Sequence, residues 1–316
     1  MTSPISPPLA APSSRAPRAE SATGRFLRHP LTRLGAVLLL LLLVAALGAQ
    51  AFSRVPETPT TEPRASVIFS NGLDALGVPH APGRGFLLGA DTLGRDVWTR
   101  LLFGARLSLS IALCAMLTST FIGTLVGLLG GFFGGRTDRS LTRLTEIVAS
   151  LPTILLAITL TLVLPDTWRQ GALWKPLNLD PRLVLAIGLV TWTGIARVVR
   201  GQVLSLRERE FVEAARAMGA PNTKILFRHI LPNVLPSVIT LATLATANNI
   251  LLEAGLSYLG LNTPDAPSWG SMIAEGQPFF SSAPWITLAP GIAIVLAVVA
   301  FNLLGNALTE SLETRR

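Results

Sequence analysis

The chain has 316 residues, of which 50% are hydrophobic and only 14% are charged, with a formal net charge of +8. A soluble domain has about 25% charged residues, so this composition excludes one and indicates a membrane protein. The single cysteine, Cys114, excludes a disulfide framework, and the three histidines show no metal-ligand spacing. No GxxxxGK[ST] loop, nucleophile elbow or HExxH motif occurs. We therefore predict no catalytic residues, no metal site and no cofactor bound by this chain.

Residues 1–30 are rich in Ser, Pro and Ala, which predicts a disordered tail. The first apolar run, Leu31–Phe52, is long enough to span a bilayer. Its basic flank and the Ala49-Gln50-Ala51 sequence also imitate a cleavable signal peptide. We favour a retained span, because the run exceeds the 7–15 apolar residues that are usual in a signal peptide. Residues 31–106 would then be this span plus a long extracytoplasmic segment.

The latter half of Gly89–Arg106 has Val97, Leu101 and Leu102 on one helical face. This pattern fits either a short amphipathic helix at the outer membrane interface or a solvated extension of the next membrane helix. The pattern does not separate the two.

Five more apolar runs approach the roughly 20 residues that a membrane span needs. With the first run they predict an all-α polytopic membrane protein with six transmembrane helices, five of them in a core at 107–309 and followed by a tail at 310–316. These runs are Leu107–Phe133, Ile147–Leu164, Leu183–Val199, Pro236–Leu252 and Ile286–Leu304.

Glycines recur every four residues near the end of the second run, at Gly123, Gly127, Gly131 and Gly135. This spacing exposes bare backbone along one helix face, where a neighbouring helix can approach closely. We predict a helix-packing stripe.

The positive charge is unevenly distributed along the chain. If the N-terminus is cytoplasmic, 17 of the 26 Lys and Arg residues fall in cytoplasmic segments. This positive-inside bias predicts that both termini are cytoplasmic. The net charge is thus a topology signal, and we expect no nucleic-acid partner.

The fifth run carries two asparagines, Asn248 and Asn249, and its span ends with the acid Glu253. An intramembrane carboxylate is a candidate functional group, and the three residues could line a translocation path. Alternatively, Glu253 lies near the outer end of its span and reaches water or pairs with an outer arginine.

A charged segment, 207–232, separates the fourth and fifth runs. Arg207–Met218 is predicted to be an amphipathic helix with Phe211, Ala214, Ala215 and Met218 on one face. Gly219 would end it in a left-handed conformation, and a second helix would stop at Pro232. Such a hairpin could dock in a groove of a partner or simply lie on the membrane.

The segment contains Glu213-Ala214-Ala215, then Gly219, then Leu231-Pro232. This spacing resembles the EAA loop, the coupling loop of ATP-binding-cassette (ABC) importer permeases. His229 stands where isoleucine is usual.

Four further stretches are similar to the C-type subunit of the dipeptide/oligopeptide/nickel permease family. They are GADTLGRDVWTRLLFGARLSLSIAL, GFFGGRTD, LLEAGLSYLGL with PSWG, and FNLLGNAL. The resemblance covers about 26–312 and implies a type I ABC importer permease architecture in a bacterial cytoplasmic (inner) membrane.

The resemblance also implies partners: a B-type permease subunit, an extracytoplasmic solute-binding protein and two ATPase subunits that hold ATP and Mg. The expected cargo is a peptide or related small solute. A proton-coupled secondary carrier is the alternative, but it would need titratable groups near mid-membrane, and Glu253 is the only acid in a predicted span.

Overall fold

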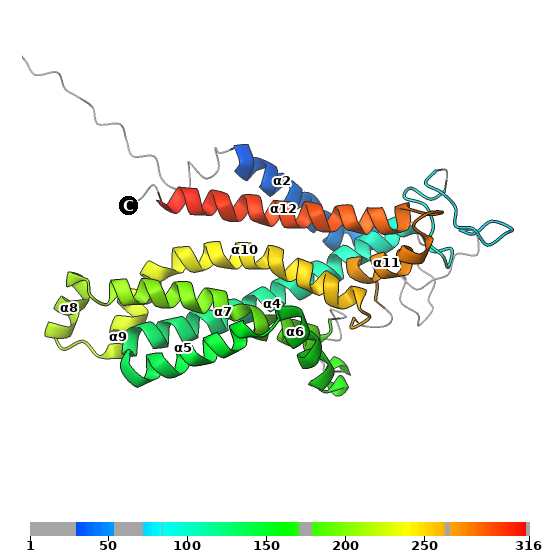
Figure 1. Ribbon diagram of the computed structural model, residues 1–316. Helices are drawn as coiled ribbons and strands as arrows, with labels where there is room; N and C mark the ends of the chain where they lie inside the picture. The colour runs from blue at the N-terminus through cyan, green and yellow to red at the C-terminus, as the bar shows by residue number, and fades with distance from the viewer. Residues whose placement is uncertain (1–29, 54–71, 84, 171–178, 263–265, 314–316) are drawn as a thin grey trace, which may run out of the picture.

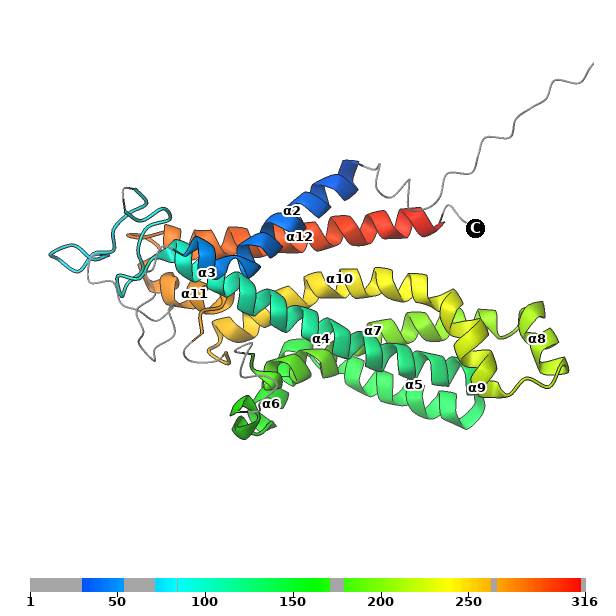
Figure 2. The same cartoon turned by 180° about the vertical axis from the view of Figure 1, so that it is seen from behind.

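The computed structural model describes residues 30–53, 72–83, 85–170, 179–262 and 266–313. The predicted tail 1–30 lies outside these residues, except for Pro30. Long helices run side by side along one direction (Figures 1 and 2), and no β-strand occurs in the described ranges. The helices are α2 (Pro30–Leu47), α3 (Ala49–Phe52), α4 (Val97–Phe133), α5 (Gly135–Ser150), α6 (Thr153–Val163), α7 (Pro181–Leu206), α8 (Glu210–Ala217), α9 (Asn222–Ile225), α10 (Leu231–Tyr258), α11 (Trp269–Gly276) and α12 (Trp285–Glu313).

Five helices are long and apolar enough to cross a membrane: α2, α4, α7, α10 and α12. The pair α5–α6 supplies a sixth span if it is counted as one. The prediction of an all-α polytopic membrane protein is therefore confirmed. In the figures α8 and α9 stand at one end of the long helices, and α11 and the 72–96 segment stand at the other. We call these the hairpin end and the loop end.

The third predicted span, Ile147–Leu164, is not a single straight helix. α5 and α6 meet at a bend of 97°. Leu151 has an extended backbone (φ −85°, ψ 141°), because the ring of the following proline disfavours the helical conformation in the residue before it. The segment 135–146, which precedes this run, is helical and belongs to α5.

α4 is continuous from Val97, so the latter half of the 89–106 segment extends the second membrane helix rather than forming a separate interfacial helix. The Asp96 side chain caps this helix by accepting a hydrogen bond from the Thr99 N–H. The extension is not a solvated one, because Val97 and Leu102 are buried. At the other terminus of the core, α12 reaches Glu313, so most of the predicted 310–316 tail is helical.

Three of the four stripe glycines face α7. A Cβ at Gly123, Gly127 or Gly131 would stand 2.7 Å from an α7 atom, which is closer than side chains normally approach. Gly135 is not part of this packing: it has φ +56° and nothing within 4 Å of a Cβ, because α4 ends at Phe133 and the chain turns there into α5. The packing prediction fits the first three glycines and is wrong for Gly135.

Candidate functional site: the 207–232 hairpin and the loop end

The segment between α7 and α10 folds as a helical hairpin. Gly219 follows α8 with φ +77°, as predicted, and the Ala220 N–H donates a hydrogen bond to the Ala215 carbonyl at 3.0 Å. This left-handed geometry is the usual glycine-dependent end of a helix. The turn brings α9 back beside α8.

The second arm of the hairpin does not stop at Pro232, and that prediction is wrong. A turn of π-helix, Leu226–Ile230, joins α9 to α10, and Pro232 lies in the first turn of α10. A proline has no N–H to donate to the preceding turn, and that turn is a π-turn and not a regular α-helical one. The hairpin is therefore continuous with a membrane-length helix.

The apolar face predicted for α8 is divided between the interior and the surface. Ala215 is 3% exposed and packs with Val212 in the core of this end. Phe211 and Met218 are 42% and 81% exposed, and Ala214 is exposed as well. Since Glu210 and Glu213 are exposed as well, the surface of α8 carries apolar side chains and carboxylates side by side.

Two contacts tie the hairpin to the end of α4. The Arg216 guanidinium lies 5.8 Å from the centre of the Phe132 ring, a cation–π distance. Arg207 donates to the carbonyl of Gly131 at 3.1 Å. A displacement of α8 would therefore reach both α4 and α10.

A cleft of about 1140 Å³ lies at the base of the hairpin. Its walls come from the end of α7, from α8 and from the start of α10, and include Gln202, Glu210 and Asn233. The exposed ring of Phe211 is part of this cleft, so the outer face of α8 is hollowed on one side.

The three polar residues of α10 do not share one environment. Asn248 is exposed, whereas Asn249 and Glu253 are fully buried. The alternative in which Glu253 reaches water or an arginine is wrong, because this carboxylate faces the helices that pack against α10. Its Oε1 accepts a hydrogen bond from the Ser257 hydroxyl at 2.7 Å. Glu253 Oε2 and both polar atoms of the Asn249 amide have no hydrogen-bond partner among the described residues.

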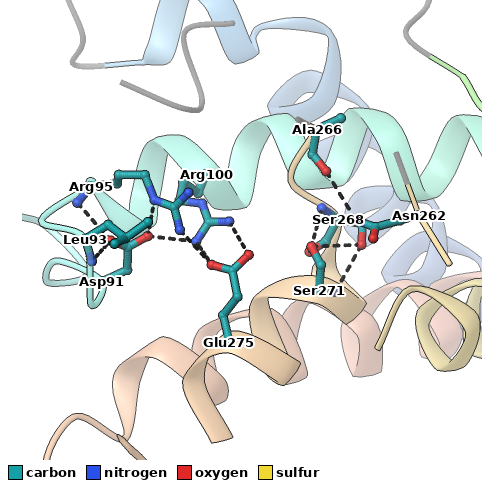
Figure 3. A network of polar contacts seen from close by, with 9 residues as sticks. All are labelled: Asp91, Leu93, Arg95, Arg100, Asn262, Ala266, Ser268, Ser271 and Glu275. Atoms are coloured by element: carbon teal, nitrogen blue, oxygen red, sulfur yellow. Dashed lines mark hydrogen bonds and ion pairs between the residues drawn. The ribbon is translucent and has the colours of Figure 1, made fainter. Parts of the chain in front are cut away.

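The loop end carries a partly buried ion-pair network that the sequence patterns did not single out (Figure 3). Arg100, which is 3% exposed, donates to Asp91 Oδ2 at 2.7 Å and to both Glu275 oxygens, at 2.7 and 3.0 Å. Arg95 also donates to Asp91 and Glu275, at 2.6 and 2.7 Å. The network joins the loop before α4, α4 itself and α11. The sequence feature that could have pointed to this network is Arg100, a charged residue beside the apolar face of α4.

This network predicts an acid-sensitive contribution to stability. Burial opposes ionisation of Glu275, but the hydrogen bonds and charges of Arg100 and Arg95 outweigh it and hold its pKa below the ordinary 4.5. A lowered folded-state pKa adds stability that is complete above the unfolded pKa and is lost as the pH falls through the folded value. We expect the unfolding temperature of the purified protein to fall as the pH drops below about 4.5, and Glu275→Gln to reduce this acid-dependent fall. An unchanged pH profile in the variant would remove Glu275 as its source.

Comparison with known proteins identifies the family. Residues 123–316 match the family model described as "Binding-protein-dependent transport system inner membrane component". The chain is 33% identical over 293 residues to the oligopeptide transport system permease protein OppC of Bacillus subtilis, covering 92% of this chain and 88% of that protein. It is 37% identical over 307 residues to a putative peptide permease protein of Brucella ovis, and the match covers 96% of this chain and 93% of that protein.

A third relative is the dipeptide transport system permease protein DppC of Alkalihalophilus pseudofirmus. It is 37% identical over 229 residues, which cover 72% of this chain and 71% of that protein. The family match at 123–316 includes the 207–232 hairpin. The chain belongs to the family of binding-protein-dependent transport system inner membrane components.

Proposed function

We propose that this chain is the C-type membrane subunit of an ATP-driven importer that carries peptides, or a related small solute, across a bacterial cytoplasmic membrane. The names of its relatives support a peptide cargo. The observation that carries the coupling role is the hairpin: its exposed face holds Phe211, Ala214 and Met218, while its second arm runs into α10. An apolar short helix of this kind suits a groove in a partner protein.

In this proposal the chain is a conduit and a transducer, and the solute crosses without chemical change. Two ATPase subunits bind ATP with Mg²⁺ and grip the hairpins of this chain and of a B-type permease subunit. Glu213 lies at the docking surface. Closure of the ATPases displaces α8, and the ties from Arg216 and Arg207 pass this motion to α4. An extracytoplasmic binding protein delivers the solute to the loop end.

The translocation path would lie between this chain and the B-type subunit. Of Asn248, Asn249 and Glu253, only Asn248 is exposed, so its side chain could contact the solute there. Asn249 and Glu253 face the inside of this subunit. This position gives them no contact with the solute in the proposed path.

The energy source distinguishes this function from a proton-coupled carrier. We expect the complete complex, reconstituted in vesicles with its binding protein, to accumulate labelled peptide when ATP is supplied. An imposed proton gradient without ATP should drive no uptake, because the one acid in α10, Glu253, is fully buried inside the subunit. Uptake that follows the proton gradient and ignores ATP would reject the proposal.

The proposed orientation places the hairpin end and both termini in the cytoplasm. In a Cys114→Ala background, we expect Ala81→Cys to react with a membrane-impermeant thiol reagent on intact cells, since Ala81 is exposed at the loop end. Met218→Cys, at the 81% exposed hairpin position, should react only after permeabilisation. The reverse pattern would show that the chain is inserted the other way round.

A further inference from the structure

The loop end contains a repeated turn. Residues 72–78 read GLDALGV and residues 89–95 read GADTLGR, so both contain the pattern Gly-x-Asp-x-Leu-Gly. In each copy the aspartate Oδ1 accepts hydrogen bonds from the backbone N–H groups two and four residues later, at 2.8–2.9 Å. The second glycine of each copy has φ +75°. The two segments therefore have the same fold as well as the same sequence pattern.

The second copy shows what this turn can bind. With Oδ1 engaged by the backbone, Asp91 Oδ2 is directed to the guanidinium groups of Arg95 and Arg100, at 2.6 and 2.7 Å (Figure 3). The Asp91 side chain is 1% exposed. Charge-assisted contacts of this kind are short and directional, and here they hold the turn against α4.

The first copy has the same turn without a cation. Val78 occupies the position that Arg95 has in the second copy, and the Asp74 side chain makes no ion pair within the described residues. Around it, Leu76 is 88% exposed and Val78 is 44% exposed. An exposed carboxylate can pair with an arginine of a partner protein. The two exposed apolar side chains beside it can contact an apolar side chain next to that arginine.

The first copy is also held rigidly. A Cβ at Gly72 would lie 2.2 Å from the Gly94 carbonyl oxygen, so the backbones of the two turns are in direct contact. The His80 N–H donates to the Gly72 carbonyl at 2.9 Å, and the Ala90 N–H donates to the His80 carbonyl at 2.8 Å. A preformed surface of this kind loses little conformational entropy when a partner binds.

We propose that the 72–78 turn is a docking site for the extracytoplasmic solute-binding protein, and that Asp74 receives an arginine of that protein while Leu76 and Val78 receive an adjoining apolar side chain. The inference rests on the proposed function. The position of the turn selects this partner: the 72–96 loops project beyond the ends of the long helices, away from α8 and α9 (Figures 1 and 2). A second permease subunit would instead meet the sides of those helices.

The test is the affinity of the loaded binding protein for the complete transporter in lipid nanodiscs. Asp74→Asn keeps an oxygen that can accept the turn hydrogen bonds but removes the charge, and it should raise Kd about threefold at low salt. Leu76→Ser should raise Kd about tenfold. The matched control is Ala75→Ser, at the exposed position between them, which should leave Kd unchanged.

Salt dependence and cross-linking supply independent readouts. The wild-type affinity should fall more steeply with salt than that of Asp74→Asn. A photo-reactive cross-linker on Leu76→Cys, in a Cys114→Ala background, should capture the binding protein. Capture of the B-type subunit alone, or equal Kd values for wild type, Asp74→Asn and Leu76→Ser, would overturn the docking site while ATP-driven uptake by the wild type still upheld the proposed function.

Discussion

Gly219→Val is expected to abolish ATP-driven uptake while leaving the chain inserted and assembled with its B-type partner. Gly219 has φ +77°, and a Cβ at this position would meet nothing within 4 Å, so the cost is one of backbone conformation and not of collision. A β-branched residue in the left-handed region costs on the order of 1–2 kcal/mol. That cost is too small to unfold the packed helices, but relief of the strain would move α8 relative to α9.

The measurement is uptake of labelled peptide in vesicles, together with stimulation of ATP hydrolysis by the loaded binding protein. Glu213→Lys should have the same effect, because it reverses the exposed charge next to Ala214. The matched control is Gly219→Asn, since asparagine tolerates the left-handed region better than valine does, and it should retain a large part of the uptake. Full uptake by both Gly219→Val and Glu213→Lys would show that the hairpin is not the coupling element.

Gly127→Leu is expected to prevent the assembly of a stable protein. A Cβ at this position would stand 2.7 Å from the Ala196 carbonyl oxygen and 2.7 Å from the Val199 Cβ. The first of these atoms is backbone, so no side-chain rotation can make room. Overpacking a well-packed core typically costs about 1–3 kcal/mol and occasionally more, and here the added groups would separate α4 from α7.

The comparison is Gly194→Leu on α7, where a Cβ would meet nothing within 4 Å. We expect Gly127→Leu to give little folded protein after detergent extraction and size-exclusion chromatography, and Gly194→Leu to give nearly the wild-type yield. Equal yields from the two variants would mean that the close approach of α4 and α7 does not limit stability. The Gly135→Leu variant adds a third case, in which the cost arises from φ +56° and not from packing.

The local features of this protein follow from its sequence. Membrane helices can be recognised from apolar runs because a helix in lipid must satisfy its backbone hydrogen bonds within its own segment. The turn at Gly219 could be predicted for a similar reason, since the left-handed end of a helix depends on one residue and its neighbours. The EAA spacing could also be recognised in the sequence, apart from His229, because all of its residues lie within one hairpin.

Features that depend on partners distant in sequence were decided by the tertiary structure. The pattern of α8 grouped Phe211 with Ala215, but helix periodicity defines a face and not what covers it, and the core turned only Ala215 inward. Glu275 lies 175 residues from Arg100, so no local pattern could pair them. Gly135 continued a spacing that the end of α4 interrupts. Glu253 is buried because other helices pack against its face of α10. The amino-acid sequence determined where helices form; the packing of those helices decided which side chains are buried, paired or left for a partner.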